Sequence, residues 1–224
     1  MKKDRIIILI QTIVIIAAGF FSGDSAFALI NSGIGVIFNY LVSVNQPVGF
    51  WFGIVYALMN GAIAIQGGIY ATAFFMIAIQ APMAVYSYIS WKKKKGIDAQ
   101  GRMKEFGRRG NLILTAAMIA SSIVMYGVLQ VVNGQNSWID TVFFVFSVYA
   151  CFLLAFYYKE AYVLCFLSGA GGCILWFTQM LRTGNGLALS LFYLIVAVNS
   201  AIGLKMQYGK QKNVNERLFF RNTL

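Results

Sequence analysis

The feature that most constrains this chain is a long apolar segment that ends in a run of lysines. Residues 70–91 are mostly apolar, and residues 92–95 are all lysine. A helix rises about 1.5 Å per residue, so the segment covers about 30 Å, the thickness of the hydrocarbon core of a bilayer. Tyr88 and Trp91 lie near its end, where interfacial aromatic side chains gather. The segment therefore predicts a membrane-spanning helix whose basic end faces the cytoplasm.

The composition of the whole chain agrees with a membrane protein. Of its 224 residues, 59% are hydrophobic and 11% are charged, and the mean hydropathy is +0.72. The net charge of +11 could point to nucleic acid. However, the basic residues are confined to short segments between apolar spans, as the positive-inside rule describes. We therefore expect the lipid bilayer, and no nucleic acid, as a partner.

Eight apolar spans follow one another, and each is predicted to be a helix because backbone polar groups in lipid must be hydrogen-bonded within the protein. The first, at residues 6–21, could instead be a signal peptide that ends at Ala26-Phe27-Ala28. Cleavage there would cut into the second span, so we favour a retained helix. The other spans lie at residues 26–44, 48–65, 70–91, 111–132, 138–156, 161–181 and 186–206.

The distribution of basic residues supports this number of spans. If the amino terminus is cytoplasmic, every lysine and arginine except Arg182 falls on the cytoplasmic side. Removing one internal span would move the basic residues of the carboxy-terminal tail to the other side, against the positive-inside rule. We therefore predict eight transmembrane helices with both termini in the cytoplasm.

The spans also indicate an internal repeat. Without the first span, three helices precede the helix at residues 111–132 and three follow it. The third helix of each triplet carries small and polar residues, such as Ser87 and Asn199, before a basic segment. We predict an all-α integral membrane protein with a parallel-repeat core of three, one and three helices. Residues 1–25 would form an accessory helix, residues 26–210 a transporter domain and residues 211–224 a cytoplasmic tail.

The sequence contains no catalytic or metal-binding constellation, so we expect no enzymatic activity, cofactor or metal ion. The chain has no histidine, and its acidic residues lie in loops or near helix ends. Cys151, Cys165 and Cys173 lie within apolar spans, which argues against a disulfide framework or a zinc site. Ion pathways usually need acids at depth, and only Asp140, about one turn into its span, comes close. Its position is also typical of an acid favoured by the dipole at a helix start.

Neutral polar residues within the spans are the candidates for a binding site. Amides can donate and accept hydrogen bonds without charge, and an indole ring offers a plane on which a heterocycle can stack. Such a set suits a nucleoside, although amides in membrane helices also join helix to helix. We predict a substrate site near the middle of the membrane, between the two triplets, with Trp176 as its floor. The predicted substrate-binding residues are Asn39, Asn60, Gln80, Trp176, Gln179 and Asn199.

Two groups of glycines are interpreted as close contacts between helices. Gly49 and Gly53 are four residues apart, and Gly169, Gly171 and Gly172 form a second group. Neither group is followed by the Gly-Lys-Ser/Thr sequence of a phosphate-binding loop. Packing, and not phosphate binding, is therefore the expected role.

Several short motifs resemble the PnuC-type nicotinamide riboside transporter family over nearly all of residues 27–210. The resemblance implies the repeat fold of the sugar facilitators called SWEETs, often with an extra N-terminal helix. It also implies homotrimers in the bacterial cytoplasmic (inner) membrane and facilitated diffusion. A cytosolic kinase would trap the substrate by phosphorylation without stable contact with the transporter. The motifs are Gly53, Gly68-Ile-Tyr70, Pro82-Met83, Trp91 with its lysines, Tyr158-Lys-Glu160, Ile174-Leu-Trp176 and Asn199-Ser-Ala-Ile-Gly203.

The chain departs from the family pattern at residues expected to face the substrate. Where the family pattern reads Trp-x-x-Trp-x-x-x-Asn, this chain has Tyr162, Cys165 and Gly169, and Ala84 replaces a glutamine after Pro82-Met83. These changes leave a transporter fold and alter the pocket. Nicotinamide riboside and a purine or pyrimidine (deoxy)nucleoside are the expected substrates. Another vitamin, such as thiamine or riboflavin, and an ion-coupled carrier remain alternatives.

Overall fold

The computed structural model describes the backbone of residues 2–93 and 103–222, and the side chains of residues 5–93 and 103–207. Lys94 and Lys95, in the predicted cytoplasmic loop, lie outside the described residues, as do residues 223–224 of the tail. The protein is all-α, as predicted, and eight of its helical segments are long and apolar enough to cross a membrane. The elements are α1 (Lys2–Ser22), α2 (Ala26–Ser43), α3 (Gly49–Gln66), α4 (Tyr70–Phe74), η1 (Phe75–Gln80), α5 (Ala81–Lys92), α6 (Arg108–Val131), α7 (Ser137–Ala155), α8 (Ala161–Thr183) and α9 (Leu187–Asn222).

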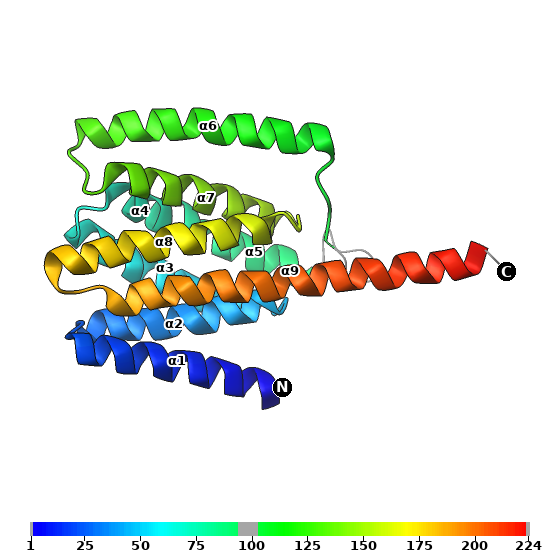
Figure 1. Cartoon of the computed structure of the whole chain (residues 1–224), viewed down its shortest axis with the longest axis horizontal. Coiled ribbons are helices and arrows are strands. Elements are labelled where there is room, and N and C mark those ends of the chain that lie inside the picture. Colours follow the sequence, from blue (N-terminus) through cyan, green and yellow to red (C-terminus); the bar gives the residue numbers. More distant parts are fainter. Residues whose placement is uncertain (1, 94–102, 223–224) are drawn as a thin grey trace.

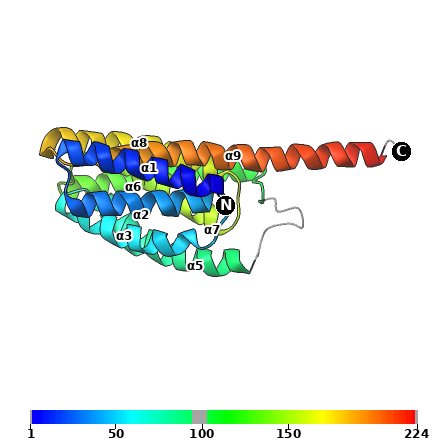
Figure 2. The ribbon, with the colours of Figure 1, turned by 90° about the horizontal axis from the view of Figure 1, so that it is seen from below.

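Two helices differ in length from the predicted spans. Helix α6 begins at Arg108, three residues before the predicted start of its span. Helix α9 continues to Asn222, so no break in the helix marks residue 210, where we predict that the transporter domain ends. Figures 1 and 2 show α9 extending far beyond the other helices.

The repeat core forms a ring of helices. Around the ring, α2 contacts α3, α3 contacts the α4–η1–α5 span, that span contacts α7, and α8 and α9 lead back to α2. Each triplet therefore occupies one side of the ring, and the triplets meet twice, at α4–η1–α5 with α7 and at α9 with α2. Helices α6 and α1 lie outside the ring, on opposite sides in Figure 1, with α6 against α7 and α1 against α2 and α9.

The turns between successive helices gather at two ends of the bundle. We call the end that carries Lys92, Arg108 and Lys159 the basic end, and the end that carries Gly68 and Gly184 the distal end. The amino terminus lies at the basic end, and α9 leaves the bundle there too (Figure 1). An even number of spans returns the chain to the side on which it starts. The eight helices that are long and apolar enough to cross a membrane agree with this arrangement.

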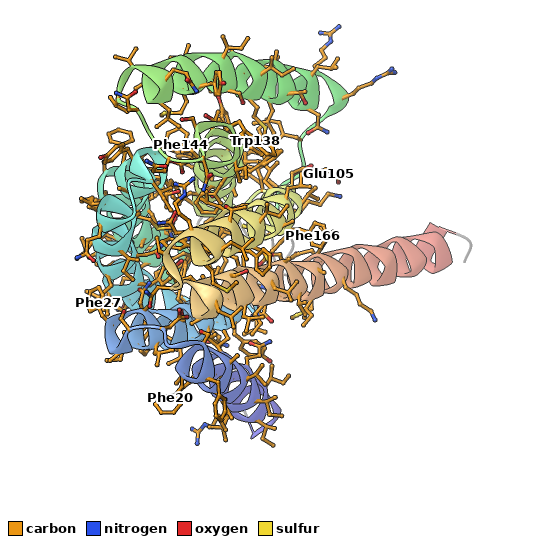
Figure 3. All side chains as sticks on the ribbon, turned by 60° about the vertical axis from the view of Figure 1, so that its left-hand side comes forward. Phe20, Phe27, Glu105, Trp138, Phe144 and Phe166 are labelled. Carbon is orange, nitrogen blue, oxygen red and sulfur yellow. The ribbon has the colours of Figure 1, made fainter. Side chains whose placement is uncertain are left out.

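Apolar side chains cover the outward faces of the helices. Phe20 projects from the outside of α1 and is 71% exposed (Figure 3). On α6, Ile113 and Ile123 are each 70% exposed, and Leu129 is its one buried residue. Large apolar side chains so exposed in a helical bundle are compatible with lipid as the surrounding solvent.

The fourth span, which is the third helix of the first triplet, contains a π-helical turn that is not predicted from the sequence. Pro82 has no backbone N–H to donate to the carbonyl four residues earlier, and its ring disfavours a regular helix there. The chain widens over Phe75–Gln80, and the N–H of Ala81 donates to the carbonyl of Met76, five residues earlier. Such turns occur often at functional sites.

Gly49, Gly53, Gly169 and Gly172 lie at close helix contacts, which confirms the interpretation for them, whereas Gly171 makes only ordinary contacts. A Cβ atom on Gly169 would lie 2.7 Å from the backbone nitrogen of Ala197 on α9. A Cβ atom on Gly53 would lie 2.7 Å from the ring of Phe38 on α2. Only the absence of a side chain allows these helices to approach so closely.

Candidate substrate site

A cavity of about 100 Å³ lies inside the ring of helices. None of the described residues that line it carries a formal charge. Most of the lining is apolar, with a few amides and hydroxyls, as in sites for small organic ligands. Each of the six spanning segments of the ring contributes side chains to the lining. Examples are Asn39 of α2, Tyr56 of α3, Gln80 of η1, Ser147 of α7, Ser168 of α8 and Tyr193 of α9.

Two of the predicted site residues line the cavity. Asn39 comes from the first triplet's first helix, and Gln80 is the last residue of the π-helical turn. The side-chain oxygen of Asn39 is buried and has no hydrogen-bond partner among the described residues. Because a buried acceptor without a donor is costly, a ligand that donates a hydrogen bond would be stabilised there.

Asn60 lies outside the cavity and contacts one of its walls. The side chain of Asn60 is fully buried, and its oxygen accepts from Asn31 at 3.3 Å. The side-chain nitrogen of Asn60 donates to the hydroxyl oxygen of Tyr193 at 3.3 Å. The hydroxyl of Tyr56 also donates to the hydroxyl oxygen of Tyr193, at 2.9 Å. Asn60 thus fixes two tyrosines that line the cavity, and it touches the site through them.

The other three predicted residues join helices away from the cavity. Trp176 is 2% exposed and packs in the core between helices. Gln179 donates to the carbonyl of Gly67 at 3.4 Å. Asn199 and Gln11 exchange two amide hydrogen bonds, of 2.9 and 3.3 Å, which attach α1 to α9. The structure does not bring these three side chains to the pocket lining, and a substrate-binding role for them stays a prediction.

The hydroxyl groups and the thiols of the cavity are not among the binding residues predicted from the sequence. The hydroxyl oxygens of Ser147 on α7 and Ser168 on α8 lie 2.6 Å apart and share a hydrogen bond. Cys151 and Cys165 line the cavity on the same two helices. Their spacing offers a signal, because small polar residues recur three or four apart on the inner faces of apolar helices. Such pairs include Asn39 with Ser43, Ser147 with Cys151, and Cys165 with Ser168.

An aromatic layer separates the cavity from the distal end. Phe75, Phe143, Phe192, Tyr193 and Tyr56 line the cavity on that side, and each is at most 4% exposed. The ring centroids of Phe143 and Phe192 lie 5.1 and 5.0 Å from that of Tyr193. The layer contains residues from both triplets, so it must rearrange if a substrate passes through it.

A second group of aromatic side chains lies between the cavity and the basic end. Phe50, which lines the cavity, packs against Trp91 with ring centroids 5.1 Å apart, and Trp91 stacks on Tyr157 at 5.2 Å. The Trp91 indole donates to the carbonyl of Leu154 at 3.2 Å, which links α5 to α7. Burial raises the pKa of Tyr157 to about 12, so its hydroxyl stays neutral.

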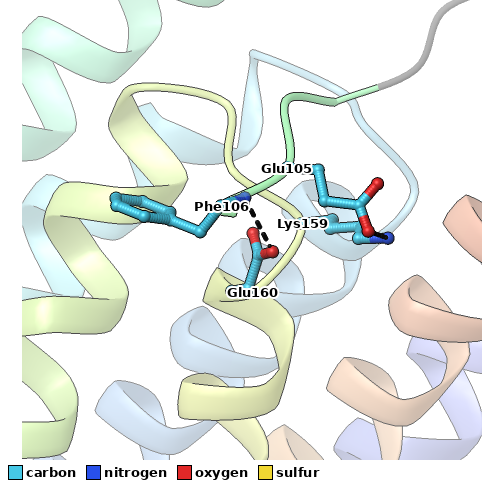
Figure 4. A network of polar contacts seen from close by, with 4 residues as sticks. All are labelled: Glu105, Phe106, Lys159 and Glu160. Carbon is cyan, nitrogen blue, oxygen red and sulfur yellow. Dashed lines mark hydrogen bonds and ion pairs between the residues drawn. The ribbon is translucent and has the colours of Figure 1, made fainter. Parts of the chain in front are cut away.

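The segment before α6 binds to the turn between α7 and α8 at the basic end. Figure 4 shows Glu160 accepting from the backbone N–H of Phe106 at 2.9 Å, beside the ion pair of Glu105 with Lys159 at 2.6 Å. Lys104 adds two backbone hydrogen bonds to the same turn. This segment holds the basic end of the second triplet in place.

Three of the departures from the family pattern lie in the cavity lining. Tyr162, Cys165 and Ala84 all face the cavity. Gly169 instead contacts the backbone of α9, where a Cβ atom would lie 2.7 Å from the nitrogen of Ala197. An asparagine at this position, as in the family pattern, would not fit against α9.

Comparisons with known proteins give one family match and one similar solved structure. The model of the family described as "Nicotinamide mononucleotide transporter" matches residues 25–206. Among solved structures, the "Crystal structure of the Vitamin B3 transporter PnuC" is similar, with a TM-score of 0.80 over 95% of this chain and 93% of that chain. Its sequence is 19% identical, so this likeness concerns the fold. A search of curated proteins found no match. The family match spans most of this multi-pass membrane chain, which therefore belongs to the nicotinamide mononucleotide transporter family.

Proposed function

We propose that the chain carries a nucleoside-like molecule across the membrane by facilitated diffusion and binds it in the ring cavity. The observation that carries this proposal is the uncharged lining, which offers amide and hydroxyl groups between aromatic rings. A phosphate group would bring buried charge that no described lining residue could neutralise, and such burial costs several kcal/mol. The proposed substrate is therefore a nucleoside and not a nucleotide.

Nicotinamide riboside and a purine or pyrimidine (deoxy)nucleoside both fit this chemistry. The rings of Phe38 and Phe75 offer faces for a base, and Asn39 and Gln80 offer partners for ring edges or sugar hydroxyls. Tyr162 and Cys165 replace the family's tryptophans, so we rank a (deoxy)nucleoside at least equal to nicotinamide riboside. The aromatic rings would also tolerate a delocalised cation, which keeps thiamine as the alternative substrate.

The substrate class can be tested on the purified protein with a panel of compounds. The panel contains nicotinamide riboside, nicotinamide mononucleotide, purine and pyrimidine nucleosides and deoxynucleosides, thiamine and riboflavin. We expect a nucleoside to bind at least about tenfold more tightly than its own monophosphate, a difference of about 1.4 kcal/mol. Isothermal titration calorimetry measures both. Tighter binding of the monophosphate would contradict the proposal.

Transport in liposomes is expected to equilibrate the substrate and not to concentrate it. No described residue of the cavity lining is an aspartate, glutamate, histidine, lysine or arginine, and proton or sodium coupling usually uses such groups at depth. Uptake of the best-binding compound should therefore reach the same plateau with and without a proton or sodium gradient. Accumulation above the external concentration, driven by either gradient, would favour an ion-coupled carrier.

The orientation in a bacterial inner membrane is proposed from the charge distribution. The basic end should face the cytoplasm, with both termini, because lysine and arginine favour that side. In a variant lacking native cysteines, a cysteine at Arg109 should resist an external impermeant thiol reagent, and cysteines at Gln135 and Asn185 should react. All three positions are exposed. External labelling at Arg109 would reverse the orientation.

A homotrimer and metabolic trapping complete the proposal, and both rest on the family resemblance. A cytosolic kinase that phosphorylates the substrate would prevent its return, because the cavity offers nothing to neutralise a phosphate. Such a kinase needs no stable contact with the transporter. Mass measurement of the protein in nanodiscs tests the trimer.

A further inference from the structure

Two carboxylates at the distal end bind the starts of helices in the opposite triplet. Asp140, on the first helix of the second triplet, is fully buried. Its two oxygens accept from the backbone N–H groups of Ala71 and Thr72, each at 3.0 Å, at the start of α4. Asp24, just before α2, accepts from the N–H groups of Gly186 and Ala188, each at 2.6 Å, at the start of α9.

The two contacts are equivalent under the internal repeat. In each, an acid at the start of one triplet's first helix binds the start of the other triplet's third helix. Together they occupy both places where the triplets meet. Ser25 behaves differently, because its hydroxyl accepts from Ala28 at the start of its own helix. The acids therefore join the triplets, whereas Ser25 caps one helix locally.

These contacts favour a closed distal end. They are hydrogen bonds and not covalent links, so they can break when the triplets separate. A carboxylate accepts strong charge-assisted hydrogen bonds from the free N–H groups at a helix start, where the helix dipole also favours negative charge. If the triplets separate at this end, both acids lose their partners and water must replace them. The contacts lie on the distal side of the aromatic layer that contains Phe143 and Tyr193. They and the aromatic layer therefore both lie between the cavity and the distal end.

We infer that Asp24 and Asp140 are positioning residues of transport that hold the distal end closed, and that both contacts break when the cavity opens there. The inference rests on the proposed transport through this cavity. Replacement of either acid by asparagine removes the charge and leaves one oxygen for two N–H donors. Each variant should therefore raise the fraction of molecules that are open at the distal end.

Cys151 and Cys165 line the cavity and report on its accessibility without any substrate. The test uses the full chain with Cys173 replaced by serine, in cells whose orientation the labelling at Gln135 has established. A membrane-impermeant methanethiosulfonate reagent is added outside, and mass spectrometry follows modification of the two cavity thiols. Asp24→Asn and Asp140→Asn should each speed modification about tenfold, which corresponds to about 1.4 kcal/mol in the opening equilibrium. The double variant should show roughly the product of the two effects.

Ser25→Ala is the matched control, because it removes a helix cap one residue from Asp24 without separating the triplets. It should lower thermal stability and leave the labelling rate unchanged. If Asp140→Asn does not fold, Asp24→Asn and Asp24→Ala decide the question alone. Unchanged labelling in folded Asp24 variants, or equal acceleration by Ser25→Ala, would overturn the inference. Because the assay needs no added substrate and no knowledge of its identity, a failed compound panel would leave this result interpretable.

Discussion

Replacing Gln80 by alanine is expected to weaken substrate binding about tenfold or more. The amide lines the cavity at the end of the π-helical turn, with its neighbours Phe75 and Met76 on the same wall. Losing one hydrogen bond costs about 0.5–1.5 kcal/mol, and more if the ligand's polar group stays buried without a partner. About 1.4 kcal/mol corresponds to tenfold in the dissociation constant. Calorimetry with the best-binding compound of the panel measures the change.

Gln179→Ala is the matched control, since it removes the same amide from a different helix, α8, at a position outside the cavity. Its side chain donates to the carbonyl of Gly67 and so joins α8 to the turn after α3. This variant should bind the substrate with unchanged affinity and should melt at a slightly lower temperature. If Gln179→Ala weakens binding and Gln80→Ala does not, the site lies closer to Trp176, as the sequence analysis predicts.

Replacing Gly169 by alanine is expected to have the largest effect on stability. The added Cβ atom would lie 2.7 Å from the nitrogen of Ala197 and 2.9 Å from the carbonyl oxygen of Tyr193. Both are backbone atoms, so α8 and α9 would have to move apart as whole helices. Overpacking of this kind costs about 1–3 kcal/mol. Because Tyr193 also lines the cavity, the variant should bind substrate more weakly at temperatures where it is still folded.

Gly171→Ala, two residues away on the same helix, provides the comparison. The nearest atom to its Cβ position is the Cα of Phe143, at 3.9 Å, an ordinary contact distance. A thermal melt in detergent should separate the two variants, with Gly171→Ala close to the unchanged protein. Equal melting temperatures for Gly169→Ala and the unchanged protein would show that the contact between α8 and α9 adapts readily.

Helix number and type follow from local properties of the sequence. An apolar segment long enough to cross lipid must form a helix, whatever it packs against, because its backbone groups find no other partners there. The match is close for α7, predicted at residues 138–156 and observed at Ser137–Ala155. The differences in span limits, such as the early start of α6 at Arg108, lie at helix ends, where a polar residue fits inside or outside the helix equally well.

Which amides face the cavity depends on how each helix is rotated against its neighbours. Asn39 and Asn60 look alike in sequence, each within an apolar span, yet Asn39 lines the cavity and Asn60 lies behind Tyr193. Asn199 bonds Gln11 of the accessory helix, a partner 188 residues away. No periodicity within one span contains that information, because membrane helices use the same amides for joining helices and for binding ligands.

The sequence by itself determined the eight apolar spans, their alternation with basic segments and the repeat of two triplets, because span length and charge act residue by residue. It also placed Asp140 at a helix start. Only the tertiary structure decided that this carboxylate binds the start of α4 in the other triplet, and that Asp24 does the same for α9. Those hydrogen bonds join segments 68 and 164 residues apart. They exist only because the ring closes and brings the two triplets together at both of their edges.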